Sequence, residues 1–148
     1  MQRSMPVVLC MIALLLLTTI TVAAEADDCI VLHYGKMHSW LKGKPVRRIF
    51  AGPPNYKSIS KGDRKEAVWM LVLVQTLCVR PLSTDIETEE VNDIREIQLV
   101  FPNELQHYQM QHLSNNLVIA TGSLFFGQSG HHHTKVLLDV TDIRSTLD

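Results

Sequence analysis

The chain of 148 residues lacks the signatures by which many enzymes are recognised. It has no glycine-rich phosphate loop, no nucleophile elbow and no paired carboxylates in a catalytic pattern. It also lacks internal repeats and low-complexity tracts, and its one long apolar run is N-terminal. These absences favour a small binding or accessory domain over an enzyme.

Cysteine is scarce, with three in the whole chain and no Cys-x-x-Cys pair. Cys10 lies in the N-terminal apolar run, so the rest of the chain keeps Cys29 and Cys78. In an oxidising compartment, two cysteines most simply form one disulfide. We therefore expect these two to be bonded and to tether the N-terminal end of the domain to its body. Two free thiols, one of them catalytic, are the alternative.

The N-terminus has the pattern of a secretory signal peptide. Arg3 precedes an apolar core over residues 7–17, and small residues end the segment before Glu25. The pattern predicts a signal peptide over residues 1–24, export to the periplasm or the medium, and a single domain over residues 25–148 without a stable membrane span. An uncleaved N-terminal anchor is the alternative.

The net charge does not indicate any class of binding partner. Arg3 is the one charged residue of the predicted signal peptide, so its removal changes the net charge from −1 to about −2. Neither a nucleic-acid partner nor a membrane surface follows from so small a total.

The pattern of apolar segments predicts a mainly β domain with five strands and one helix. The strands are expected over residues 37–50, 67–74 with a continuation at 77–79, 94–101, 117–126 and 135–143, and the helix from Asn103 to about Leu113. A helix between the third and fourth of five strands is the order of the oligonucleotide/oligosaccharide-binding (OB) barrel. Gly43 and Gly122 fit strands that curl to close a small barrel. An open antiparallel α+β sandwich with the same order is the alternative.

The order of elements predicts where two unusual loops lie in the fold. The loop over residues 51–66 joins the first two strands, and the loop over residues 127–134 joins the last two. In an OB fold both loops border the usual binding face. We therefore expect a ligand site between them, and its residues are Asn55, Tyr56, Asp63, His131, His132 and His133.

The three consecutive histidines allow several interpretations. In the structural one, one imidazole packs, one caps a backbone group and one is solvated. In an extended segment His131 and His133 share a face, which makes a site for zinc or copper an alternative. Further ligands would then have to come from the rest of the chain, and the candidates are His33, His38, His107, His112 and Asp63. No cofactor is predicted.

A third interpretation is a hydrolase that acts on envelope polymers. Ser129 lies two residues before His131, and Asp63 would orient the imidazole if the two loops meet. No catalytic residue is assigned, because no sequence signature supports the arrangement.

Charge is unevenly distributed along the chain. Residues 42–65 contain eight basic side chains and one acidic one, whereas residues 85–96 have a net charge of −5. The basic stretch suits an anionic polymer, with Tyr56 as a stacking platform, although charge runs are usually just solvated. The expected partner is an envelope glycan or another exported protein, and nucleic acid is not expected.

Several strings resemble a bacterial exported family of unknown function, the domain-of-unknown-function family 4431. They are Gly52-Pro53-Pro54-Asn55-Tyr56, Ile97-Gln98-Leu99-Val100, Gly122-Ser123-Leu124-Phe125 and Gly130-His131-His132-His133-Thr134. The resemblance runs from about Lys42 to Ile143. It implies a small exported domain and supplies no activity. Phe101 stands before Pro102 where such sequences tend to carry a helix-capping threonine.

Overall fold

The structure is a computed structural model that describes residues 29–36, 38–82 and 89–147, with the backbone alone for residues 104–107. The signal peptide predicted over residues 1–24 lies outside the described residues. Within the described part of the chain, no helix has both the length and the apolar character needed to cross a membrane.

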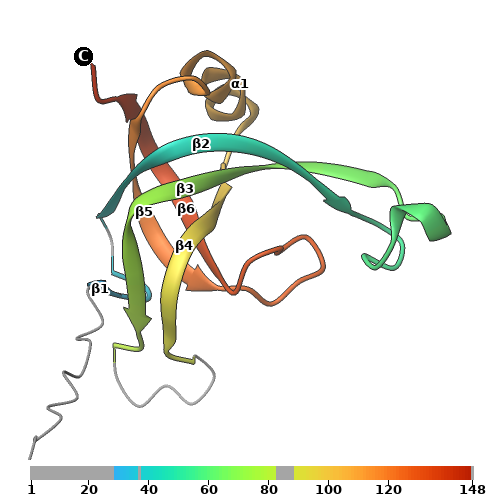
Figure 1. Ribbon diagram of the computed structural model, residues 1–148, viewed down its shortest axis with the longest axis horizontal. Helices are drawn as coiled ribbons and strands as arrows, with labels where there is room; N and C mark the ends of the chain where they lie inside the picture. Colours follow the sequence, from blue (N-terminus) through green and yellow to red (C-terminus); the bar gives the residue numbers. More distant parts are fainter. Residues whose placement is uncertain (1–28, 37, 83–88, 148) are drawn as a thin grey trace, which may run out of the picture.

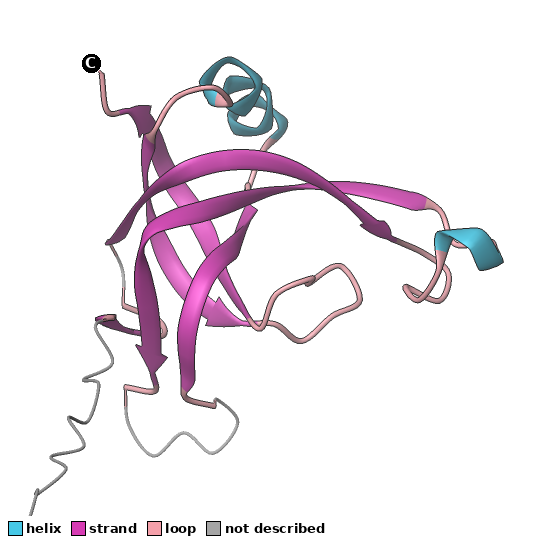
Figure 2. Cartoon of the chain, in the orientation of Figure 1, coloured by secondary structure: helices cyan, strands magenta, loops and turns pink. Residues whose placement is uncertain are grey.

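The described residues form six strands, one α-helix and a short 3-10 helix (Figures 1 and 2). In chain order these are β1 (Ile30–His33), β2 (Ser39–Ala51), η1 (Ile59–Lys61), β3 (Lys65–Arg80), β4 (Val91–Val100), α1 (Glu104–Leu113), β5 (Val118–Phe126) and β6 (Val136–Ser145).

Strands β2 to β6 close a five-stranded barrel, which confirms the OB-like architecture predicted from the sequence. The strands follow the order β3-β2-β5-β6-β4, and β4 pairs with β3 to close the ring. Neighbours in this ring are antiparallel except for β4 and β6, which are parallel. The open antiparallel sandwich is therefore wrong, because the sheet closes and contains a parallel pair.

The barrel interior is apolar because alternate side chains of each strand point inward. Buried residues alternate with exposed ones in the first half of β2 and with partly exposed ones along most of β5. Met110 of α1, which is fully buried, joins the same core as the inward side chains of the strands. Burial of each large apolar side chain stabilises the fold by roughly 1.5–3 kcal/mol. The inward side chains of this core include Leu41, Leu71, Ile97, Leu124 and Leu138.

Two glycines mark the tightest places of the barrel, as their positions in predicted strands indicated. Gly43 pairs with Leu73 on one side and with Val118 on the other, and a Cβ atom there would overlap the carbonyl oxygen of Val72. Gly122 lies at a shift of register between β5 and β6, where a Cβ atom would overlap the carbonyl oxygen of Asp139. The strands can approach so closely only because these residues have no side chain.

Beyond the barrel, β2 and β3 continue as a two-stranded arm. β2 pairs with β5 over residues 39–43 and β3 pairs with β4 over residues 69–79, so residues 48–51 and 65–68 pair with each other. We call residues 48–68 the arm. It reaches out past the barrel and ends at η1 (Figure 1). The connecting loop is thus shorter than the predicted 51–66, because the strands extend into it.

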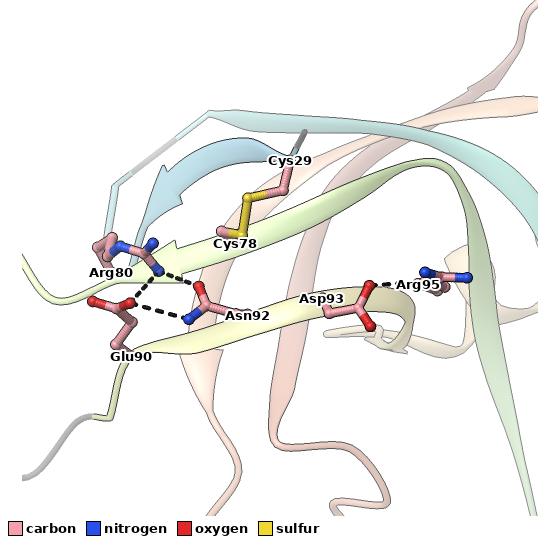
Figure 3. Close-up of a disulfide and its surroundings, with 7 residues drawn as sticks. All are labelled: Cys29, Cys78, Arg80, Glu90, Asn92, Asp93 and Arg95. Atoms are coloured by element: carbon pink, nitrogen blue, oxygen red, sulfur yellow. Dashed lines mark hydrogen bonds and ion pairs between the residues drawn. A yellow bond between two sulfur atoms is a disulfide. The ribbon is translucent and has the colours of Figure 1, made fainter. Parts of the chain in front are cut away.

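Strand β1 was not predicted, and the disulfide adjoins it. β1 pairs in parallel with β3, with Ile30 beside Leu77. Cys29, directly before β1, is bonded to Cys78 of β3 (Figure 3). The predicted disulfide is therefore confirmed, and the alternative of two free thiols is wrong for this structure.

We expect reduction of the Cys29–Cys78 bond to destabilise the protein by about 2–4 kcal/mol, because the bond restricts the unfolded chain. Urea unfolding of the purified protein with and without dithiothreitol measures the effect. The double variant Cys29→Ser/Cys78→Ser should match the reduced protein and no longer respond to dithiothreitol. Equal midpoints for oxidised and reduced wild-type protein would contradict the prediction.

Candidate functional site

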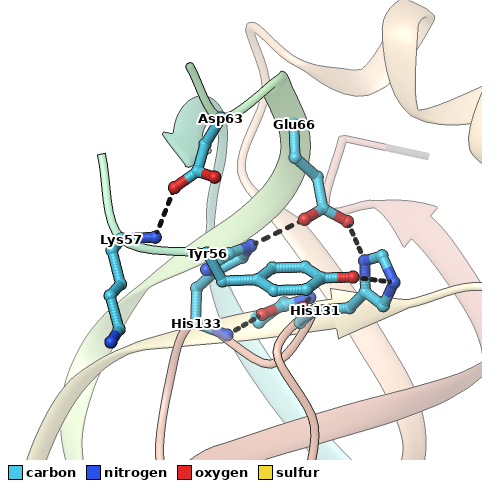
Figure 4. A network of polar contacts seen from close by, with 7 residues as sticks. Tyr56, Lys57, Asp63, Glu66, His131 and His133 are labelled. Atoms are coloured by element: carbon cyan, nitrogen blue, oxygen red, sulfur yellow. Dashed lines mark hydrogen bonds and ion pairs between the residues drawn. The ribbon is translucent and has the colours of Figure 1, made fainter. Parts of the chain in front are cut away.

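Residues 52–64, which connect β2 and β3 at the end of the arm, form the arm loop. The arm loop and the loop between β5 and β6 meet, as the order of elements predicted. The hydroxyl of Tyr56 is hydrogen bonded to Nε2 of His131 at 2.8 Å. The two rings meet edge to face with centroids 4.9 Å apart (Figure 4). We call residues 127–134 the His loop, and the contact between it and the arm the rim.

Glu66 is the carboxylate of the rim, and sequence reasoning missed it. One carboxylate oxygen is 2.5 Å from Nδ1 of His131, and the other is 3.3 Å from Nε2 of His133. Glu66 stands opposite Phe50 in the β2–β3 ladder, and the Phe50 ring stacks on His133 with centroids 4.2 Å apart. The available signal was strand alternation, which places these two side chains on one face of the arm once the hairpin register is known.

The three histidines have three different roles. His133 packs against Phe50, and its side chain is 10% exposed. Nδ1 of His132 accepts backbone N–H bonds from Gln128 and Ser129 at 2.9 and 3.2 Å. The side chain of His131 is 57% exposed. One ring packs, one caps backbone groups and one is solvated, which is the structural interpretation given to the motif.

His132 is held neutral by its surroundings. Burial is the main cause that lowers its pKa, and the neighbouring His131 and His133 lower it further. Its Nδ1 atom accepts two backbone hydrogen bonds, which requires that this nitrogen carry no proton. The ring also lies edge-on against Phe125, so His132 is part of the loop's framework.

Gln98 fixes the His loop to the barrel, and it too was missed as a site residue. Its amide nitrogen donates to the carbonyl of His131 at 2.9 Å, and its amide oxygen accepts from the N–H of His133 at 2.7 Å. The side chain is buried, so these bonds satisfy groups that water does not reach. The signal in the sequence was a polar residue inside the apolar string of β4.

Asp63 and Asn55 shape the arm loop and do not face the imidazoles. The carboxylate of Asp63 accepts backbone N–H bonds from Asn55, Lys57 and Ser58 at 2.8–3.0 Å and a side-chain bond from Asn55 at 3.1 Å. Glu66, and not Asp63, is the carboxylate hydrogen bonded to His131 (Figure 4). The backbone bonds from Ser58 and Lys57, together with smaller contributions from Asn55, lower the pKa of Asp63 to about 2.

Tyr56 depends on Gly130 for its position. A Cβ atom on Gly130 would lie 2.7 Å from the Tyr56 ring, so only glycine lets the His loop lie this close. Tyr56 itself has a φ of 57°, a left-handed conformation that is uncommon for a residue with a side chain. Asp63 holds that turn through the neighbouring backbone N–H groups.

The predicted additional metal ligands whose side chains the structure describes are not gathered at the rim. His33 is hydrogen bonded through Nδ1 to the carbonyl of Pro81, and His112 lies against Tyr108 within α1. His38 lies in a turn with a φ of 70°, and the side chain of His107 lies outside the described residues. In the described part of the chain, no three His, Cys, Asp or Glu side chains are grouped so as to hold a metal ion.

A family model described as "Domain of unknown function (DUF4431)" matches residues 96–144. This segment is similar to the DUF4431 family, which confirms over residues 96–144 the resemblance noted in the sequence. The DUF4431 match covers the end of β4, then α1, β5 and most of β6, and it includes Gln98 and the whole His loop. Tyr56 and Glu66 precede it, so the rim joins the DUF4431 segment to the arm. Neither curated proteins nor solved structures gave a match to the chain.

We expect the variant Asp63→Asn to lower the melting temperature at pH 7 by several degrees, because its amide N–H₂ would face backbone donors. The stabilisation by ionised Asp63 is present above the unfolded-state pKa of about 4 and is lost as pH falls toward about 2. The difference between wild type and variant should therefore shrink over that range.

Melting curves at a series of pH values check this prediction. Asp142→Asn is the matched control, since Asp142 is exposed on β6 and makes none of these loop contacts. Equal melting temperatures for wild type and Asp63→Asn at pH 7 would refute the role given to this carboxylate.

Proposed function

We propose that this protein is an exported binding domain that holds its ligand at the rim between the arm loop and the His loop. The observation that carries the proposal is the contact of Tyr56 with His131. It joins the two loops that border the binding face of OB barrels and leaves the His131 side chain 57% exposed.

The rim suits a ligand rich in hydroxyl groups. The phenol of Tyr56 and the imidazole of His131 can each exchange hydrogen bonds with sugar hydroxyls. Glu66 and Gln98 hold these groups in place before a ligand arrives, which reduces the entropy lost on binding. An envelope glycan is accordingly the proposed ligand class, with another exported protein as the alternative.

Charge near the rim adds to this preference. Lys57, Lys61 and Arg64 of the arm loop are exposed, and in the described part of the chain none of them forms an ion pair. The two acidic groups of the arm, Asp63 and Glu66, are occupied by backbone N–H groups and by the histidines. The surface presented to a ligand is therefore cationic, which favours glycans that carry acidic groups.

Export rests on two independent features. The N-terminal segment has the signal-peptide pattern, and the Cys29–Cys78 bond is of a kind that persists in oxidising compartments. When the full chain is expressed in a bacterium, we expect the exported fraction to contain protein that begins near Glu25, by N-terminal sequencing. Retention of the intact N-terminus in the cytoplasm would contradict export.

We expect Tyr56→Phe and His131→Ala each to weaken binding of a glycan fragment by roughly three- to tenfold, the effect of losing one hydrogen bond. Calorimetric titration with soluble cell-wall fragments and with acidic envelope oligosaccharides measures this. Tyr108→Phe is the control, because Tyr108 is 58% exposed on α1 and not part of the rim. Unchanged affinity in both rim variants would refute the site.

Hydrolysis of the same polymers is the second candidate. Tyr56, His131 and Glu66 form a hydrogen-bonded series of hydroxyl, imidazole and carboxylate, the order found for an activated nucleophile with its base and orienting group. Release of fragments by wild-type protein, lost in Tyr56→Phe and Glu66→Gln, would favour an enzyme. Zinc or copper retained by tag-free protein and lost in His131→Ala/His133→Ala would favour metal binding instead.

A further inference from the structure

A groove of about 410 Å³ opens where β3 and β4 separate. β4 ends at Val100 and the chain turns toward α1, whereas β3 continues into the arm. The lining includes Ala67, Trp69, Leu99, Phe101, Pro102 and Asn103. This volume lies within the range of cavities that bind small molecules.

The groove and the rim lie on opposite faces of the arm. Glu66 and Ala67 are consecutive in β3, so their side chains point to opposite sides of the strand. Glu66 contacts the histidines of the rim, and Ala67 lines the groove. Neither Tyr56 nor His131 lines the groove, although its lining also includes Gln98, the residue that fixes the His loop to the barrel.

Two cationic side chains stand on the groove face. Arg47 is directly opposite Trp69 in the β2–β3 ladder, and directly opposed residues lie on the same face. Lys65 precedes Ala67 by two positions, which also places it on that face. Both are exposed, and neither forms an ion pair within the described residues.

The same face has exposed apolar surface. Ile49 stands opposite Ala67 and is 59% exposed, so it extends the apolar wall of the groove along the arm. Trp69 and Leu99 are 5% and 3% exposed, and packing fixes them in the wall. Apolar walls with two cations on the same face of the sheet are complementary to an anion that has an apolar body.

We propose that this groove binds a small organic anion with an apolar ring or chain. The apolar part lies against Ala67, Trp69 and Phe101, and the anionic group is attracted by Arg47 and Lys65. Tyr56 and His131, the ligand-binding residues proposed for the rim, do not line the groove, so failure of this proposal would leave the proposed function untouched, and the reverse also holds.

Two dyes with the same ring system test the charge requirement. The first is 8-anilinonaphthalene-1-sulfonate, and the second is N-phenyl-1-naphthylamine, which lacks the sulfonate. In the variant Trp40→Phe, Trp69 is the one remaining tryptophan and reports on the groove. We expect the sulfonate dye to bind saturably, to quench Trp69 emission, and to bind more tightly than the neutral dye.

Further variants, made in the Trp40→Phe protein, distinguish the effect of charge on dye binding from the effect of groove shape. Arg47→Gln/Lys65→Gln should weaken the sulfonate dye about tenfold, as expected for two exposed ion pairs, and leave the neutral dye unchanged. Lys42→Gln/Lys44→Gln removes the same charge from exposed residues of β2 that lie on the face opposite to Arg47, and should change neither affinity. Ala67→Leu should weaken both dyes by filling the groove, with melting curves to verify folding.

Three results would overturn the proposal. Trp69 emission that does not respond to the sulfonate dye would show that the groove is not its site. Equal affinities for the two dyes would show that no anion is selected. An equal loss of sulfonate binding in the Arg47/Lys65 and Lys42/Lys44 variants would assign the effect to net charge alone.

Discussion

The structure depends on one strand that serves two partners. β2 pairs with β5 up to Gly43 and with β3 from Gly43 onward, and the absence of a side chain there lets the three strands come together. The first pairing is one of the five that form the barrel. The second pairing, of β2 with β3, continues to Ala51, beyond the last residue of β2 that pairs with β5, and this extension is the arm. The rim and the groove both follow from this change of partner, because each lies on one face of the arm.

The rim is ordered by polar groups that satisfy one another. The side chain of Gln98 forms the hydrogen bonds with the backbone of His131 and His133 that a neighbouring strand would otherwise form. Asp63 accepts hydrogen bonds from the backbone N–H groups of the arm loop, and Glu66 joins the arm to the His loop. Both carboxylates of the arm are used internally, so its surface charge comes from lysine and arginine. The three histidines therefore serve mainly to hold the His loop in shape and against the arm, and His131 has the most exposed side chain of the three.

Much of the fold could be predicted because its signals are local. The apolar segments, Pro102 before α1 and the glycines within β2 and β5 gave the order of elements that defines the barrel. β1 was missed because four residues are too few to show a clear strand pattern in the sequence. Its position depends on contacts with a distant segment, namely the pairing with β3 and the Cys29–Cys78 bond. The predicted strand ends, Phe50 and Ala67, lie within two residues of the observed ends, Ala51 and Lys65. The arm itself was missed because the sequence does not show that these strands continue to pair after they leave the barrel.

The sequence by itself determined the local features of the molecule. It showed which segments are apolar enough to be strands, that Cys29 and Cys78 can form a disulfide, and which loops carry unusual residues. The tertiary structure alone decided which side chains meet. Glu66 reaches two imidazoles 65 and 67 residues away, and Asp63 turns into its own loop, because hairpin register and barrel closure set these distances. Local preferences act over a few residues, whereas closure of a sheet relates residues from opposite ends of the domain.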